Sequence, residues 1–216
     1  MLLKTDWFRA VMLNYDVTQL THGFESGHEC KDDCKSYYLG AMGFWFSCVL
    51  FLAFETIRKD FWQMVAHHFV TVALMAISYY YNLNRFGLMV LLLHDIGDIF
   101  LYSAKTILYK KYQATADVLF GVFAVTFFTS RIVLYPLICV IPSWQRLFPV
   151  IGSLVSFDEW IMASLPSLLA ILYCLQVFWW TLIWRMIKRT LSQKSIEKDV
   201  RSDTDDPDTT VGKKGD

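Results

Sequence analysis

Charged residues are scarce in this chain, where they make up 19% of 216 residues, and the 20 Lys and Arg balance the 20 Asp and Glu. No stripe of basic residues is present, which excludes an electrostatic nucleic-acid binder. The first six residues contain an early Asp and are not followed by a long apolar core, so a secretory signal peptide is not expected. With 55% hydrophobic and 17% aromatic residues, the composition predicts a membrane protein.

Cysteine is also scarce, with five residues in the chain. Three of them lie in apolar runs and are predicted to be packing residues. The other two, Cys30 and Cys34, are flanked by charges, and His22 and His28 are the nearby residues of a metal-binding type. Zinc frameworks need further ligands at defined spacing, so this pair favours a lumenal disulfide or two free thiols.

Five apolar stretches approach the roughly 20 residues that a helix needs to cross a bilayer. They are residues 38–54, 62–81, 86–109, 116–141 and 160–187. The expected fold is therefore an all-α, polytopic transmembrane helix bundle over residues 37–191. It follows an N-terminal polar or interfacial segment, 1–36, and precedes an acidic tail, 192–216, whose composition predicts disorder.

The basic residues of the loops predict how the bundle is oriented. One side of the membrane holds the basic positions of 58–59, 110–111 and 185–198, whereas the inter-helix loops of the other side hold Arg85 and Arg146. Because the side richer in Lys and Arg is normally cytosolic, the C-terminus is predicted to be cytosolic.

Two of the predicted spans carry polar stripes. The second span has His67 or His68, Thr71, Ser78 and Asn82 at helical spacing, and the third has His94, Asp98, Tyr102 and Lys105, with Asp95 beside them. Ionisable groups at bilayer depth cost about 2.5–3.5 kcal/mol each and usually mark function. Two such stripes on consecutive antiparallel helices are expected to face each other or a shared watery cavity.

Three interpretations of this cavity compete. The polar groups satisfy one another and hold two helices together, or they bind a metal such as zinc or iron, or they perform acid–base or nucleophilic acyl transfer. Three histidines and two aspartates exceed what a structural link needs. Adjacent His67 and His68 point about 100° apart on a helix, which disfavours a shared metal. Acyl transfer is favoured because a carboxylate can orient an imidazole and stabilise its charged form.

Arg131 is a further charge inside an apolar span, the fourth. A guanidinium at this depth either binds an anionic substrate group, such as a phosphate, or neutralises Asp95 or Asp98. Both interpretations stay open at the level of the sequence.

The order of the polar residues through the second and third spans resembles the Lag motif of the ceramide synthases, which are membrane N-acyltransferases with a TLC domain. The resemblance extends to residues 58–61, 129–131 and 199–203. The positions in register are His67, His68, Thr71, Leu74, Ser78, Tyr79, Asn82, Arg85, Gly87, His94, Asp95, Asp98, Leu101 and Lys105.

The resemblance implies an N-acyltransferase of the endoplasmic reticulum membrane, with a TLC-type helical barrel. Its substrates would be a fatty acyl-CoA and a sphingoid base, its products (dihydro)ceramide and CoA, and no cofactor or metal is expected. A homo- or hetero-dimer within the membrane lipid is a possible assembly. The loop before the last helix would influence acyl-chain length, somewhere in residues 143–157.

The resemblance also implies roles for individual residues. His67 would attack the thioester carbonyl or act as a general base, with His68 as the alternate. Asp95 and Asp98 would orient the imidazole, and His94 would relay protons. The candidates for substrate binding are Ser78, Asn82, Arg85, Tyr102 and Arg131.

This chain departs from the family pattern in two places. The family usually has Glu where this chain has Tyr102, which removes one carboxylate from the stripe. The family barrel has six spans, whereas five are expected here and residues 1–36 match poorly. The alternatives are therefore a non-catalytic TLC-domain protein that binds lipid or regulates, in a truncated form, and a membrane metal-dependent lipid hydroxylase.

Overall fold

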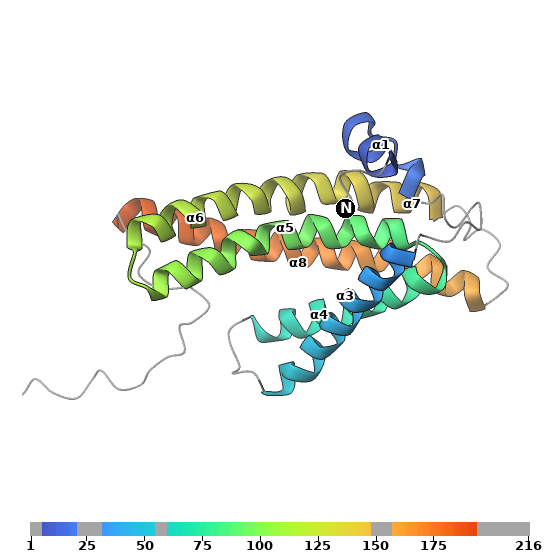
Figure 1. The fold of residues 1–216 in the computed structure, drawn as a ribbon, viewed down its shortest axis with the longest axis horizontal. Coiled ribbons are helices and arrows are strands. Elements are labelled where there is room, and N and C mark those ends of the chain that lie inside the picture. Colours follow the sequence, from blue (N-terminus) through green and yellow to red (C-terminus); the bar gives the residue numbers. More distant parts are fainter. Residues whose placement is uncertain (1–5, 21–31, 55–59, 148–156, 194–216) are drawn as a thin grey trace, which may run out of the picture.

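A computed structural model describes residues 6–20, 32–54, 60–147 and 157–193 of the chain. Every secondary-structure element in these ranges is a helix, as predicted (Figure 1). The elements are α1 (Asp6–Asn14), α3 (Asp32–Phe51), η2 (Leu52–Phe54), α4 (Phe61–Tyr80), α5 (Asn84–Tyr109), α6 (Gln113–Phe127), η3 (Phe128–Leu134), η4 (Pro136–Val140), α7 (Ile141–Leu147) and α8 (Phe157–Gln193).

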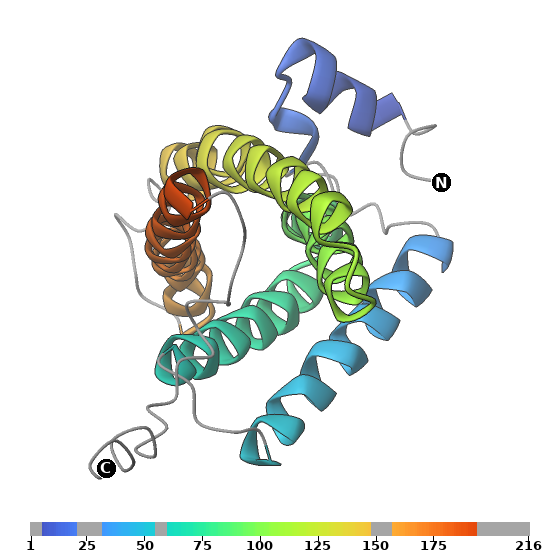
Figure 2. The ribbon, with the colours of Figure 1, turned by 90° about the vertical axis from the view of Figure 1, so that its left-hand side faces the viewer.

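Four of the described helices are long and apolar enough to cross a membrane: Phe61–Tyr80, Asn84–Tyr109, Gln113–Arg146 and Trp160–Thr190. Seen end-on, they form a ring in the order α4, α5, α6 with its continuation to α7, and α8 (Figure 2). Helix α8 closes the ring because it packs against α4 as well as against η3, η4 and α7. The polytopic all-α fold that the sequence predicts is confirmed.

The first predicted span, residues 38–54, lies in α3 and η2. Helix α3 crosses the outside of the ring against α4 and α5. It falls short of the other four in apolar character because it begins with Asp32 and Asp33 and contains Lys35 in its second turn. The described part of the chain therefore has four helices that meet the criterion for a span instead of the five predicted.

The helix predicted to end at Pro142 continues to Leu147, so that boundary prediction is wrong. The segments η3 and η4 are π-helical, with a wider turn than the α-helix, and Pro136 lies at the start of η4. Pro142 has no N–H to donate to the preceding turn. The Tyr15 hydroxyl donates instead to a carbonyl of that turn, Leu137 O, at 2.6 Å. Replacement partners of this kind allow a proline to lie inside a membrane helix.

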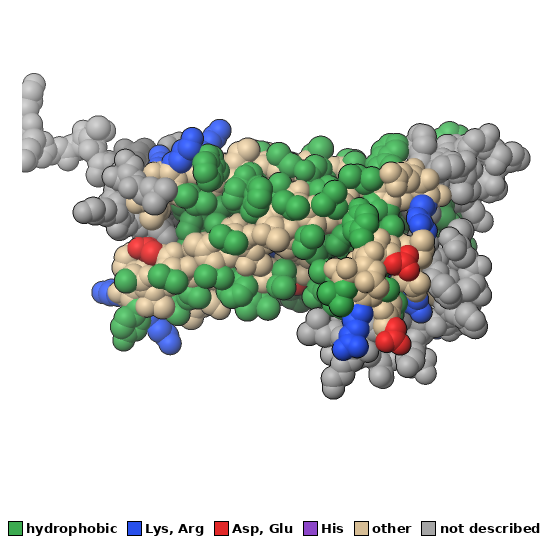
Figure 3. Space-filling model, turned by 90° about the horizontal axis from the view of Figure 1, so that it is seen from above, with side chains coloured by type: hydrophobic (Ala, Val, Ile, Leu, Met, Phe, Trp, Pro, Cys, Tyr) green, Lys and Arg blue, Asp and Glu red, His purple; other side chains and the backbone are tan. Residues whose placement is uncertain are grey.

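The N-terminal helix α1 packs on the end of the ring that holds the α4–α5 connection. Its Phe8 and Val11 are buried in the same hydrophobic cluster as Leu83 and Tyr135. The Arg85 guanidinium lies over the Trp7 ring, 5.9 Å from its centroid. Seen from above, hydrophobic side chains cover the middle of the molecule, and charged side chains gather toward its two ends (Figure 3). This distribution suits a bundle that spans a bilayer.

Helix α3 approaches α5 most closely where Tyr38 meets Gly87. Tyr38 is fully buried, and its hydroxyl donates to Met75 O at 3.3 Å. Its ring also stacks on Tyr79, with centroids 6.2 Å apart. A Cβ at Gly87 would lie 2.7 Å from Cε2 and 2.8 Å from Cζ of Tyr38, closer than van der Waals contact allows. Glycine is therefore needed at this position for α3 to reach α5.

We expect Gly87→Ala to destabilise the protein by about 1–3 kcal/mol, because the methyl group overpacks a buried ring that cannot turn away. The melting temperature in detergent, followed by circular dichroism, measures this change. Gly43→Ala is the matched control, since nothing lies within 4 Å of a Cβ at that helical glycine. Equal melting temperatures for the two variants would contradict the packing described for Tyr38.

Candidate active site

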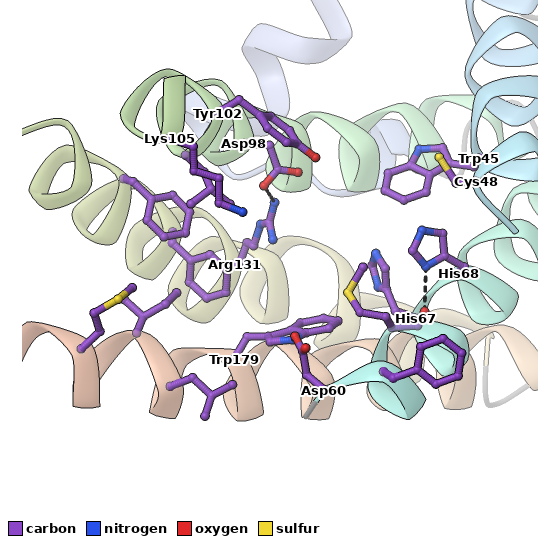
Figure 4. Close-up of a pocket in the computed structure, with 18 of the residues that line it drawn as sticks. Trp45, Cys48, Asp60, His67, His68, Asp98, Tyr102, Lys105, Arg131 and Trp179 are labelled. Carbon is purple, nitrogen blue, oxygen red and sulfur yellow. Dashed lines mark hydrogen bonds and ion pairs between the residues drawn. The ribbon is translucent and has the colours of Figure 1, made fainter. Parts of the chain in front are cut away.

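A cavity of about 380 Å³ lies inside the ring, with α3 forming part of its wall (Figure 4). It occupies the half of the bundle that holds the start of α4 and the ends of α5 and α8. We call this half the basic end, because Lys110, Lys111, Lys188 and Arg189 lie on it. The polar lining residues of the cavity are Asp60, His67, His68, Asp98, Tyr102, Lys105 and Arg131.

The two adjacent histidines of α4 both line the cavity. The Nδ1 atom of His68 lies 2.7 Å from Met64 O, the carbonyl one turn earlier in the helix. A carbonyl oxygen only accepts hydrogen bonds, so this Nδ1 carries the proton and the Nε2 atom of neutral His68 is unprotonated. His68 is thus held in the tautomer that a general base or nucleophile requires.

His67 is enclosed by aromatic rings. Its ring centroid lies 5.6 Å from Trp45 of α3 and 5.3 Å from Trp179 of α8, with interplanar angles of 80° and 88°. The Trp45 ring also lies 5.6 Å from His68. Trp179 is itself fixed, because its indole N–H donates to Asp60 Oδ2 at 3.3 Å. Edge-to-face contacts of this kind orient an imidazole without using its nitrogen atoms.

A partly buried ion pair forms the opposite wall of the cavity. Arg131 Nη2 lies 2.7 Å from Asp98 Oδ1. The same guanidinium donates through Nε to the His94 main-chain carbonyl at 3.1 Å and through Nη1 to Gln176 Oε1 at 3.4 Å. Its carbon Cζ lies 4.8 Å from the centroid of the Phe127 ring. The predicted pairing of Arg131 with an aspartate is present in the structure, and its binding of an anionic substrate group stays a prediction.

The structure does not bring all the predicted catalytic residues to the cavity wall. His67, His68 and Asp98 line it, but His94 and Asp95 do not. The His94 ring is buried one turn deeper, with its Nδ1 2.7 Å from Val90 O and its centroid 4.8 Å from that of Tyr135. Asp95 is half-buried beside the stripe.

The predicted substrate-binding residues divide into two groups. Tyr102 and Arg131 line the cavity, whereas Ser78, Asn82 and Arg85 lie at the far end of α4 and the start of α5. The Ser78 hydroxyl donates to Leu83 O at 2.8 Å, and Asn82 adopts a φ of 59° in the turn between the helices. Their observed contacts are those of a helix–helix connection, and binding by these residues stays a prediction.

Sequence reasoning missed four residues of this region: Trp45, Asp60, Gln176 and Trp179. Gln176 has a sequence signal, because a single amide stands out in a long apolar run. Asp60 has one as well, since it lies in the stretch 58–61 that the sequence resemblance includes. Trp45 and Trp179 have none, because nothing in the sequence distinguishes them from other tryptophans in the chain. The residues 55–59, 148–156 and 194–216 lie outside the described residues, and with them a predicted basic loop, most of the stretch predicted to influence acyl-chain length, and nearly all of the acidic tail. Cys30 and the side chain of Cys34 lie outside them as well, so the prediction of a disulfide or two free thiols stays a prediction.

No group of three or more His, Cys, Asp or Glu side chains within the described ranges is placed to hold a metal ion. The cavity instead combines unprotonated imidazole nitrogen, a guanidinium–carboxylate pair and apolar walls. This arrangement suits transfer of an acyl group, in which an imidazole attacks a carbonyl or removes a proton.

Comparison with known proteins gives consistent matches over most of the chain. The family model of the TLC domain matches residues 1–185. Ceramide synthase 4 of Bos taurus is 38% identical over 182 residues, covering 84% of this chain and 45% of the relative. Ceramide synthase 4 of Homo sapiens is 38% identical over 173 residues, covering 80% of this chain and 43% of the relative.

A plant protein shows a similar relationship. Ceramide synthase LOH2 of Arabidopsis thaliana is 32% identical over 195 residues, covering 89% of this chain and 66% of the relative. The chain spans about half the length of the ceramide synthase 4 proteins it matches.

Proposed function

Because the chain belongs to the TLC-domain family, we propose that it is a membrane N-acyltransferase that makes (dihydro)ceramide. It would join the acyl group of a fatty acyl-CoA to the amine of a sphingoid base and release CoA. The relatives named ceramide synthase support this assignment. The observation that carries it is the pair His67–His68 in an intramembrane cavity, with the His68 tautomer fixed by Met64 O.

In the proposed mechanism the thioester carbonyl lies beside His67, with the acyl chain between the helices. The imidazole of His67 attacks this carbon, the carbon–sulfur bond breaks, and CoA leaves as the thiolate. The sphingoid amine then attacks the acyl-imidazole to form the amide and restore the imidazole. His67 acting as a general base for direct transfer is the alternative, and the residues needed are the same.

A base is required because the substrate amine is mostly protonated near neutral pH. The unprotonated Nε2 of His68 suits this role, since it belongs to a ring that lines the cavity. The Asp98 carboxylate would stabilise positive charge near the reacting groups, although it is already paired with the Arg131 guanidinium. His94 and Asp95 do not line the cavity, so they would act indirectly, by influencing the orientation and protonation of the residues that line it.

We also propose that the protein resides in the endoplasmic reticulum membrane with its basic end and C-terminus in the cytosol. The described basic residues support this orientation by a small excess. Five lie at the basic end, Lys110, Lys111, Arg185, Lys188 and Arg189, and four lie toward the other end, Arg9, Lys35, Arg85 and Arg146. Positive residues are normally retained on the cytosolic side. The cavity lies in this half, which suits a water-soluble acyl donor that arrives from the cytosol.

The direct test uses microsomes from cells that lack their own ceramide-forming activity and express this chain. Labelled palmitoyl-CoA and sphinganine are supplied, and N-acyl product is measured by chromatography. We expect labelled dihydroceramide in proportion to the amount of inserted protein. Inserted, folded protein that binds acyl-CoA but releases no amide would contradict the enzyme and indicate a lipid-binding member of the family. Hydroxylated lipid as product would indicate a hydroxylase.

A further inference from the structure

A set of buried polar side chains lies directly behind the cavity, on the side away from the basic end. We call polar layer the side chains of Thr71, His94, Ser130 and Gln176, which come from α4, α5, η3 and α8. Each is three or four positions from a cavity-lining residue of the same chain segment, respectively His67, Asp98, Phe127 and Trp179. At 1.5 Å per residue, the main chain of each member lies about 4.5–6 Å further from the basic end than that of this cavity-lining neighbour. The long side chain of Arg131 reaches the cavity from the same depth.

The polar layer contains atoms that are buried and have no hydrogen-bond partner among the described residues. They are Thr71 Oγ1, His94 Nε2, Ser130 Oγ and Gln176 Nε2. The Nδ1 atom of His67 is also buried and has no hydrogen-bond partner among the described residues. The four side chains of the layer are between 0% and 8% exposed. Within a membrane neither lipid nor bulk water can satisfy such groups, so leaving them unmet is costly. Buried polar atoms of this kind are commonly satisfied by internal water.

The hydrogen bonds of Arg131 group members of the layer together. Its guanidinium donates to the His94 carbonyl and to Gln176 Oε1, so α5 and α8 lie on either side of one side chain. Ser130 precedes Arg131 in the same helix. Thr71 lies one helical turn from His67, which lines the same cavity as Arg131. His94, Ser130 and Gln176 therefore surround one guanidinium, and Thr71 lies on the helix that carries His67.

The hydrogen-bonding roles in the layer are determined by the partners already present. His94 Nδ1 is 2.7 Å from Val90 O, so Nδ1 carries the proton and Nε2 is an acceptor. A second proton on this ring would place two positive charges side by side, because Arg131 is bound to the carbonyl of His94. Gln176 Oε1 is used by Arg131, which leaves its amide N–H groups as donors. The layer therefore offers one acceptor, His94 Nε2, one donor group, the Gln176 amide, and two hydroxyls that can both donate and accept. Water can satisfy this mixture, whereas a cation needs acceptors and an anion needs donors.

We propose that the polar layer holds internal water molecules that join Nδ1 of His67 to Nε2 of His94. This proposal rests on the proposed function only for its catalytic consequence. A water that accepts the Nδ1–H of His67 and donates to His94 Nε2 keeps the proton of His67 on Nδ1. The Nε2 lone pair of His67 is then the one available to attack an acyl group. His94 is thus a positioning residue that acts through water without touching substrate.

The test is labelling of side chains by hydroxyl radicals that an X-ray pulse generates from water, measured by mass spectrometry on the full chain in lipid nanodiscs. These radicals react before they diffuse, so a buried side chain is labelled only where a water molecule already lies beside it. We expect His94 to be labelled in the folded protein despite its burial, as cavity-lining His67 is. The double variant Thr71→Val with Gln176→Leu removes polar partners of the water and should lose most of the labelling at His94.

Two controls separate hydration from general disturbance of the bundle. Thr71→Ser keeps the hydroxyl and should retain wild-type labelling at His94. Thr129→Val removes a hydroxyl from an exposed position next to the layer and should change nothing. Labelling of His94 only after denaturation would show a dry layer and overturn the proposal. An equal loss of labelling in Thr129→Val would overturn it as well.

An activity measurement on the same variants tests the catalytic consequence. The double variant should lower kcat for N-acylation and leave KM for acyl-CoA unchanged, because the layer does not contact the acyl donor. Lost labelling with unchanged kcat would overturn the positioning role of His94. If wild-type protein forms no amide while His94 is labelled as expected, the proposed function fails and the internal water stands.

Discussion

Replacing His67 by Ala is expected to lower the rate of N-acylation by at least about 10³-fold, because an acid–base or nucleophilic group typically contributes 10²–10⁴. His67 lies between Trp45 and Trp179 on the cavity wall, where no other described imidazole except His68 reaches the same space. The measurement is initial rate in microsomes at saturating acyl-CoA, normalised to inserted protein. His68→Ala is expected to cause a loss in the same range, because it removes the ring whose Nε2 is unprotonated.

Cys174→Ser is the matched control, since Cys174 is exposed on α8 and lies outside the cavity. It should retain wild-type activity and a wild-type melting temperature. The histidine variants should also keep a near wild-type melting temperature, because neither His67 nor His68 links two helices through a side-chain hydrogen bond in the described structure. Full activity in both single histidine variants would exclude the proposed reaction centre.

Arg131→Met is expected to give the largest loss of stability of any single substitution considered, on the order of 3 kcal/mol. The substitution keeps the apolar stem over Phe127 but removes the guanidinium that contacts Asp98, His94 O and Gln176. Asp98 is left as a carboxylate without its partner inside the bundle. The side chain of Asp98 is 32% exposed, so solvent in the cavity limits the cost to the lower part of the range for buried pairs.

At roughly 2–4 °C per kcal/mol for a chain of this size, the melting temperature should fall by about 6–12 °C. Arg131→Met combined with Asp98→Asn is the informative second variant. It removes the uncompensated charge, and part of the lost stability should return if the ion pair is the cause. A double variant that is no more stable than Arg131→Met would locate the cost in the bonds to His94 O and Gln176 instead.

Helix positions were largely predictable because long apolar runs bounded by charge have few alternatives. The expected stretches 62–81 and 86–109 agree with α4 and α5 to within two residues. The prediction that the fourth helix ends just before Pro142 was wrong, because it relied on the rule that a proline normally ends a helix. The replacement donor, the Tyr15 hydroxyl, comes from a segment more than a hundred residues earlier. No local pattern indicates such a contact.

The candidate site was predictable only in part, for a geometric reason. Helical spacing places His94 and Asp98 on one stripe, yet Asp98 lines the cavity and His94 lies behind it. A stripe shows which face of a helix points inward, but the depth at which the cavity ends depends on how the helices cross. The enclosure of His67 by Trp45 and Trp179 depends on α3 and α8, and the spacing within α4 carries no information about either.

The π-helical stretch in the fourth helix has a consequence for how this chain tolerates insertions and deletions. Across it, Arg131 and Tyr135 both point into the bundle, where Tyr135 donates to Leu169 O at 3.0 Å. Removing one residue would tighten one wide turn into an ordinary α-helical turn, and because a π-turn holds about one residue more than an α-turn, the helix beyond it would keep nearly the same face toward the bundle. Tyr135 and Arg131 would then both still point inward. Deleting a residue elsewhere in this helix would instead rotate everything after it by about 100°, so the wide turn is the place where the inner wall tolerates a change of length.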